Sequence, residues 1–89
     1  RLEAYDAADQ LLQQICAAHP HEPWLRGALA RRLLRRNRTA AARPLLDELR
    51  ITSPDSSPVW FDLGVLARQE GDVEAARAAM RRSFELDPS

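Results

Sequence analysis

The chain repeats itself every 34 residues, and this period constrains the fold more than any other feature. Prolines recur at that spacing, at Pro20, Pro54 and Pro88. Twelve residues before each proline stands an alanine, at Ala8, Ala42 and Ala76. Eight residues before each proline stands a large apolar side chain, at Leu12, Leu46 and Met80. A fixed period of this length is typical of arrays in which small structural units stack on one another.

Each unit is predicted to be helical. Alanine, leucine and arginine, which dominate the chain, all favour helices. Apolar and polar residues show no sustained alternation of the kind that predicts strands. The spacing of the apolar residues predicts five helices, at residues 2–18, 23–36, 39–51, 57–70 and 72–86.

Residues between these segments act as helix boundaries. Asn37 and Gly71 stand at equivalent places, and both tolerate the left-handed backbone that ends a helix. Asp72 follows as a predicted N-cap. Pro44 is the exception, because it falls inside the third helix, where proline costs about 3 kcal/mol. We expect a kink or a distorted first turn there, with Thr39 helping to cap it.

The last copy of the repeat carries a recognisable pattern. It reads W-x2-L-G-x2-A, then A-x3-M, then P, at Trp60, Leu63, Gly64, Ala67, Ala76, Met80 and Pro88. This resembles the tetratricopeptide repeat, whose pattern is W-x2-L-G-x2-Y, A-x3-F and P. The middle copy departs further, since Arg26 stands where the tryptophan is expected. The first copy is half a repeat, to which Tyr5 conforms.

The resemblance implies an all-α fold, in which antiparallel helix-turn-helix repeats stack as an α-solenoid. Residues 1–89 would then form a single fragment of about two and a half repeats from a longer array. Its parts would be the second helix of a truncated repeat and two further repeats, at 1–22, 23–56 and 57–89. The small residues of the pattern are expected to let neighbouring helices approach closely.

A stack of repeats buries its faces only against its neighbours. The apolar residues Val73, Met80 and Phe84 of the last helix are therefore expected to contact a following repeat or another copy of the chain. This makes self-association through the terminal helix a possible use of that surface.

The sequence offers little for catalysis. It has no G-x-S-x-G motif, no glycine-rich phosphate loop and no H-E-x-x-H motif, so we expect no enzyme, no catalytic residue and no cofactor. Cys16, His19 and His21 form one cluster with metal-binding side chains. One tight loop rarely supplies four ligands of good geometry, so we favour a packed Cys16, with His19 at a helix end, over a metal site.

Charge is uneven although the formal net charge is zero. Residues 23–56 hold eight arginines against three acids, and both flanking segments are acidic. The arginine run includes Arg31, Arg32, Arg35, Arg36 and Arg38. A solvated helix surface is the favoured interpretation, and an acidic protein partner is the next. Nucleic acid is disfavoured, because no aromatic residue is interleaved with the run.

The two tryptophans have different expected roles. Trp60 matches the packing tryptophan of the repeat and is assigned to the core. Trp24 stands two positions earlier in its own repeat. We expect it to pack as well, because large aromatic side chains usually bury their surface locally. The alternative is that Trp24 faces the groove as an anchor for a partner.

The resemblance implies a concave groove lined by the first helices of successive repeats. Mapping the groove positions onto this sequence predicts a partner site at Trp24, Ala28, Arg31, Leu34, Arg35, Phe61, Asp62, Val65, Arg68 and Gln69. The arginines among apolar residues would suit a peptide that carries carboxylates. The implied function is a protein-interaction scaffold, in a larger bacterial protein of an envelope, secretion or assembly complex, in the cytoplasm or periplasm. The alternatives are an accessory region of an enzyme and an arginine-rich nucleic-acid surface.

Overall fold

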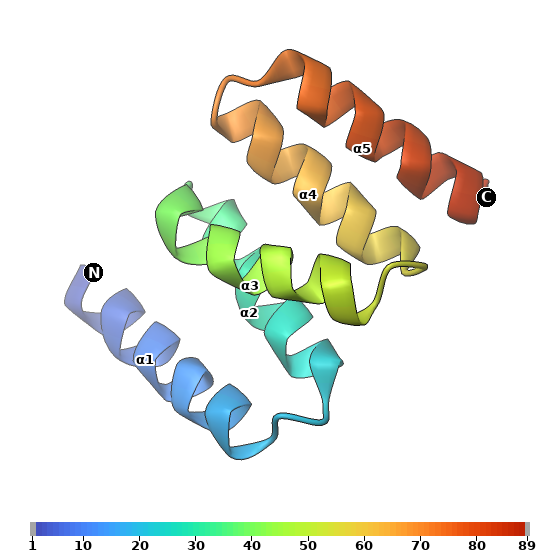
Figure 1. Ribbon diagram of the computed structural model, residues 1–89. Coiled ribbons are helices and arrows are strands. Elements are labelled where there is room, and N and C mark those ends of the chain that lie inside the picture. The colour runs from blue at the N-terminus through green and yellow to red at the C-terminus, as the bar shows by residue number, and fades with distance from the viewer. Residues whose placement is uncertain (1, 89) are drawn as a thin grey trace.

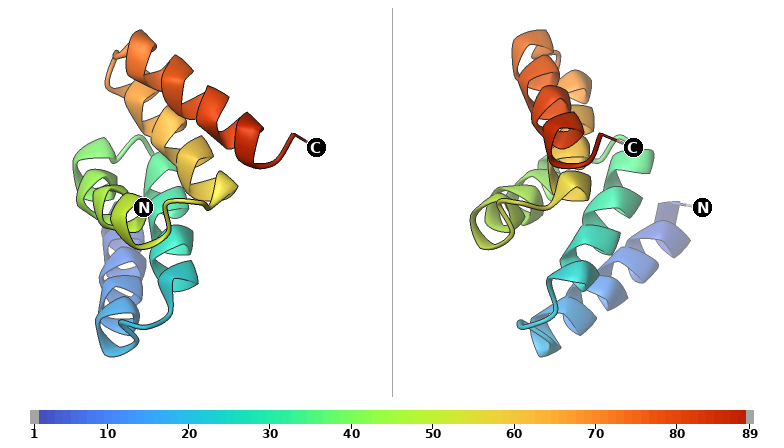
Figure 2. Two further views of the ribbon diagram at one scale, coloured as in Figure 1. Left: turned by 45° about the vertical axis from the view of Figure 1, so that its right-hand side comes forward. Right: turned by 90° about the vertical axis from the view of Figure 1, so that its right-hand side faces the viewer.

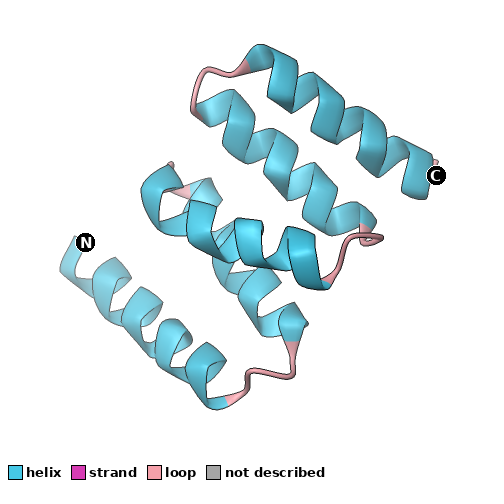
Figure 3. Cartoon of the chain, in the orientation of Figure 1, coloured by secondary structure: helices cyan, strands magenta, loops and turns pink. Residues whose placement is uncertain are grey.

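A computed structural model describes residues 2–88 of the chain and the side chains of residues 7–88. It contains five α-helices joined by short loops (Figure 1, Figure 3), which are α1 (Leu2–Ala18), α2 (Pro23–Arg35), α3 (Thr39–Thr52), α4 (Ser57–Gln69) and α5 (Val73–Leu86). Each predicted helix is present, and every bound lies within one residue of the prediction. The side chain of Tyr5, which fitted the repeat pattern, lies outside the described residues.

The helices form successive antiparallel layers. Helices α2 and α3 pack as one hairpin, and α4 and α5 pack as the next. Helix α4 also contacts both α2 and α3, so it joins the two hairpins, while α1 packs against α2. The stack therefore rises stepwise from α1 to α5, as the views in Figure 1 and Figure 2 agree. This is the all-α arrangement of stacked helical repeats expected from the sequence.

Local chemistry accounts for the helix ends. Asn37 and Gly71 have positive φ angles of 57° and 83°, as predicted for residues that end a helix. The side chain of Asp72 caps α5 by accepting a hydrogen bond from the Ala75 amide at 3.1 Å. Ser56 caps α4 through the Val59 amide in the same way.

Helix α3 begins differently from the prediction. Arg38 occupies its N-cap position, and no side chain there makes a capping hydrogen bond, so the predicted capping role of Thr39 is wrong. The helix continues through Pro44 to Thr52. Because proline has no amide hydrogen, the carbonyl of Ala40 lacks its usual helical donor. The predicted kink at this position stays a prediction.

The core runs across three helices. Its largest fully buried side chains come from α2, α3 and α4 and are Leu29, Leu33, Leu46, Leu49 and Leu66. Small residues allow close approach, as predicted. Ala30 and Ala42 are completely buried. A Cβ atom on Gly64 would lie 2.9 Å from Cγ and Cε of Met80, so glycine leaves room for the Met80 side chain against α4.

Arg26 takes over part of the role of the missing tryptophan. Its Nη1 donates a hydrogen bond to the carbonyl oxygen of Pro20 at 3.2 Å. One repeat later, Nε1 of the half-buried Trp60 donates to the carbonyl of Pro54 at 2.7 Å. The two bonds are related by the 34-residue period. Trp24 is 66% exposed, so its predicted packing is wrong.

An arginine cluster that sequence reasoning did not find attaches α1 to the rest of the stack. Asp9 is only 3% exposed. Its carboxylate accepts hydrogen bonds from Arg32, Arg36 and Arg38, at 3.0, 3.2 and 2.9 Å. The prediction that the arginine run is solvated surface is therefore wrong for these three residues. The sequence had no signal for this, because Asp9 lies 23 to 29 residues away from them.

Candidate partner-binding groove

A continuous concave surface lies along α2 and α4, and we call it the groove. It consists of two adjoining hollows of about 530 and 380 Å³, and both are lined by Arg31 and Asp62. The larger hollow extends towards the loop after α2, where Asn37 lies. The smaller extends towards the start of α2, where Trp24 lies, and is closed by the C-terminal end of α3. The groove therefore has the dimensions of a site for a short peptide segment.

Nine of the ten residues predicted to form the partner site line these hollows, namely Trp24, Ala28, Arg31, Leu34, Arg35, Phe61, Asp62, Val65 and Gln69. The tenth, Arg68, lies instead beside α5, because its position on α4 faces away from α2. Their role in binding stays a prediction. Residues that the mapping did not include are Pro23, Asn37, Leu49, Ser53, Ser56, Pro58 and Val59. Most come from loops and helix ends, which a mapping confined to the first helices leaves out.

Two aromatic side chains give the groove exposed apolar surface. Phe61 is 51% exposed, and Trp24 is 66% exposed at the far end. Leu34 and Val65 lie between the helices and form part of the lining. Large aromatic side chains that remain accessible on a rigid helix are typical anchors of protein interfaces.

An ion pair crosses the middle of the groove. Nη2 of Arg31 donates a hydrogen bond to Oδ2 of Asp62 at 3.3 Å. The Arg31 side chain is 49% exposed, whereas Asp62 is almost completely buried. Burial raises the pKa of Asp62 above its ordinary value, and the nearby Arg31 and Arg35 only partly offset this effect. The pair therefore presents a half-exposed guanidinium to any partner in the groove.

Arg35 and Gln69 complete the polar chemistry of the groove. Arg35 is exposed and forms no hydrogen bond or ion pair within the described residues. Nε2 of Gln69 donates to the carbonyl of Leu34 at 2.8 Å, which ties α4 to the end of α2. Its Oε1 is buried and accepts no hydrogen bond from the described part of the chain. Local conflicts of this kind tend to occur at functional sites.

The cysteine–histidine cluster does not come together as a ligand set. Cys16 is buried in the core, and burial raises the pKa of its thiol. His19 and His21 are exposed, and Nδ1 of His19 lies 3.2 Å from Oε2 of Glu22. Among the described residues, no group of three or more histidine, cysteine or acidic side chains is placed to hold a metal ion.

Within residues 2–88, no helix has both the length and the apolar character needed to span a bilayer.

Stacked antiparallel hairpins with a groove along their first helices define the class of α-helical repeat proteins. A family model described as the tetratricopeptide repeat matches residues 28–89 of the chain. The chain therefore belongs to the tetratricopeptide repeat family. No curated protein and no solved structure matches it.

Proposed function

We propose that the chain binds a carboxylate-bearing segment of a partner protein in the groove between α2 and α4. Tetratricopeptide repeats are non-catalytic units that generally mediate protein–protein interactions, which supports the general class. The observation that carries the specific proposal is the pairing of accessible guanidinium groups with exposed aromatic surface. Arg31 and Arg35 stand one helical turn apart on α2, next to Phe61 of α4.

The chemistry of these groups indicates the kind of segment that fits. A guanidinium can hold a carboxylate through two parallel hydrogen bonds, and such charge-assisted bonds are about twice as strong as neutral ones. Arg35 acts on Asp62 through its charge but forms no hydrogen bond or ion pair with an acid among the described residues. An acidic residue over Arg35 would therefore gain an ion pair without breaking one. Apolar residues on either side would cover Phe61 and Trp24.

The setting that we propose is a larger multi-repeat protein of a bacterial envelope, secretion or assembly complex. All thirteen basic residues are arginine, which accords with a GC-rich bacterial genome. An accessory region of an enzyme is the alternative setting, and the binding role of the groove would be the same in both. Nucleic acid is a weaker alternative, because three arginines of the run are already engaged by Asp9.

Selection from a random peptide library, followed by affinity measurement, tests the proposal. The chain would be used as bait, and the dissociation constants of selected peptides would be measured by fluorescence anisotropy. We expect selected peptides to contain acidic and apolar residues. The double variant Arg31→Glu, Arg35→Glu should bind them at least about tenfold more weakly, a loss of roughly 1.4 kcal/mol.

A matched control separates the groove from net charge. The double variant Arg77→Glu, Arg81→Glu makes the same change in charge on α5, outside the groove. It should retain the affinity of the parent. Equal weakening by both variants would contradict a groove site, as would selected peptides without acidic residues. Binding of single-stranded DNA that falls steeply with salt would instead favour the nucleic-acid alternative.

A further inference from the structure

Gly27 lies in the interior of α2, where glycine is less favourable than alanine. The other two glycines have evident structural roles, since Gly71 has a positive φ and Gly64 leaves room for the side chain of Met80. Gly27 has neither role. Its φ is not positive, and a Cβ atom added to it would meet nothing within 4 Å among the described residues. Neither the backbone nor the packing of the described chain therefore requires glycine at this position.

The open space over Gly27 belongs to the groove. Gly27 lines the smaller hollow, of about 380 Å³, together with Trp24 and Arg31 of the same helix. One period later, the same position is held by Phe61, which is 51% exposed although the α2–α3 hairpin precedes it. Pro58, one period after Trp24, is exposed as well. The position of Gly27 thus stays accessible in a repeat that has a hairpin before it, and here it carries no side chain.

The walls of the smaller hollow are mostly apolar. Trp24, which is 66% exposed, precedes Gly27 by three residues and therefore lies on the same face of α2. Pro58 and Val59 of α4 line the opposite side, and Leu49 lines it from α3. Apolar walls that surround an empty glycine surface suit an apolar side chain of a partner.

Polar groups at the edge of the smaller hollow are already engaged. Ser56 accepts the N-cap hydrogen bond of α4, and Asp62 accepts a hydrogen bond from Arg31 at 3.3 Å. A polar side chain buried beside them would lose its hydrogen bonds to water, which is costly without new partners. The groove cation without a hydrogen bond or ion pair in the described residues is Arg35, which lies in the larger hollow. It stands eight residues after Gly27 on α2.

We propose that Gly27 is a specificity-determining residue of the groove, whose missing side chain admits one bulky apolar side chain of the partner into the smaller hollow. This inference rests on the proposed function of the groove. The partner side chain would stand against the α2 backbone beside the indole of Trp24, while a carboxylate of the same segment pairs with Arg35. Eight helical residues rise about 12 Å, which an extended segment spans in about four residues. The partner segment therefore carries a bulky apolar residue about four positions from an acid.

Substitution at Gly27 separates binding from folding. Alanine favours helices and its methyl group meets nothing in the described chain, so Gly27→Ala should raise the midpoint of urea denaturation. The same methyl group would stand in the space of the partner's side chain. Peptides selected from a random library with the parent chain should therefore bind Gly27→Ala roughly threefold more weakly and Gly27→Leu at least about tenfold more weakly. Fluorescence anisotropy measures both losses.

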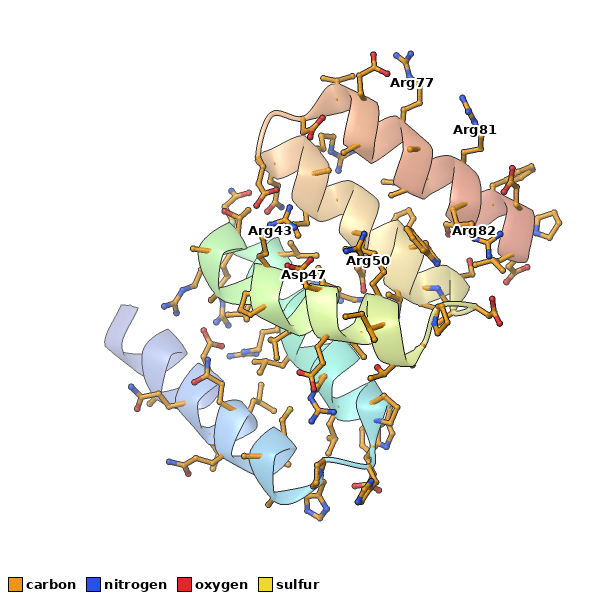
Figure 4. All side chains as sticks on the ribbon, in the orientation of Figure 1. Arg43, Asp47, Arg50, Arg77, Arg81 and Arg82 are labelled. Atoms are coloured by element: carbon orange, nitrogen blue, oxygen red, sulfur yellow. The ribbon has the colours of Figure 1, made fainter. Side chains whose placement is uncertain are left out.

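A matched control and a peptide variant make the test specific. Ala78→Leu adds the same bulk at an exposed position of α5, next in sequence to Arg77, which projects from the outer edge of the stack (Figure 4). It should bind the peptides as the parent does. Replacing the bulky apolar residue of a selected peptide by alanine should weaken binding to the parent about tenfold, but binding to Gly27→Leu by less than about threefold.

The outcomes distinguish this inference from the proposed function. Peptides that bind Gly27→Leu as tightly as the parent, yet are lost by Arg31→Glu, Arg35→Glu, would overturn the role of Gly27 and leave the groove site standing. A lower urea midpoint for Gly27→Ala would also overturn it, because the fold itself would then require the glycine. Peptides that bind Arg31→Glu, Arg35→Glu as tightly as the parent would contradict the proposed function and this inference together.

Discussion

Asp62 is a residue at which burial and charge oppose each other. Its side chain is 6% exposed, and the side chain of Arg31, which pairs with it, is 49% exposed. Replacing a buried ion pair by a neutral arrangement is often neutral or stabilising, because desolvation can exceed the attraction. We therefore expect Asp62 to matter more for the chemistry of the groove than for the stability of the fold.

We expect Asp62→Asn to raise the free energy of unfolding at pH 7 by up to about 1 kcal/mol. The pKa of Asp62 is raised in the folded chain, so the folded chain binds this proton more readily than the unfolded chain. The parent should therefore regain stability as the pH falls through the raised folded pKa towards 3.8, and the difference between the two proteins should shrink.

Urea denaturation at pH 7 and pH 4 measures both effects. Asp47→Asn is the matched control, because its side chain is 43% exposed and its ion pair lies at the surface. It should change stability by less than about 0.5 kcal/mol. A clear loss of stability in Asp62→Asn at pH 7 would show that pairing with Arg31 outweighs the burial of the carboxylate.

At the scale of elements, α1 is joined to the stack through a buried carboxylate as well as through apolar contacts. Its contact with the stack is made against α2, and Asp9 is the acid through which three arginines hold it. Helices α2, α3 and α4 meet through the leucine core, to which α1 contributes Cys16 and the partly buried Leu12. An element held by few apolar contacts can open without global unfolding.

We expect Asp9→Ala to expose α1 selectively. Loss of a buried acceptor of charged hydrogen bonds should cost about 1–3 kcal/mol of local stability. Hydrogen exchange followed by mass spectrometry should show faster exchange in α1 and nearly unchanged exchange in α4 and α5. Glu48→Ala removes an exposed acid that lies 3.4 Å from Arg26 and should leave α1 protected. Unchanged protection of α1 in Asp9→Ala would argue that apolar packing alone holds it.

At the scale of the whole molecule, the repeats are equivalent in sequence but not in burial. Leu46 and Met80 occupy the same position of successive repeats, yet Leu46 is completely buried while Met80 is partly exposed. In a linear stack each unit is stabilised by its neighbours. The contribution of a side chain at a given repeat position to the free energy of unfolding therefore depends on whether the adjacent face is covered.

Substituting each of these two residues by alanine should therefore lower the free energy of unfolding by different amounts. Leu46→Ala should lower the free energy of unfolding by about 3 kcal/mol, because it leaves a cavity in the shared core. Met80→Ala should cost about 1–2 kcal/mol, since part of its surface is already in solvent. Chemical denaturation of both variants checks this, and equal losses would contradict the unequal burial of Leu46 and Met80.

Much of the fold follows from short-range features of the sequence. The helix bounds were predictable because proline, glycine, asparagine and aspartate act on the backbone next to them. The prediction that Thr39 caps α3 was wrong for a reason that is also local, because Arg38 occupies the N-cap position. The groove positions were mapped from the family pattern, and Arg68 differs from the other nine in lining a depression beside α5.

The sequence by itself therefore determined the repeat, the five helices and the face on which the first helices lie. These depend on the 34-residue period and on local backbone preferences. The tertiary structure decided that Asp9 gathers three arginines and that Arg31 pairs with the buried Asp62. Such outcomes depend on which side chains meet across helices, and residues 20 or more positions apart leave no local signal of that meeting.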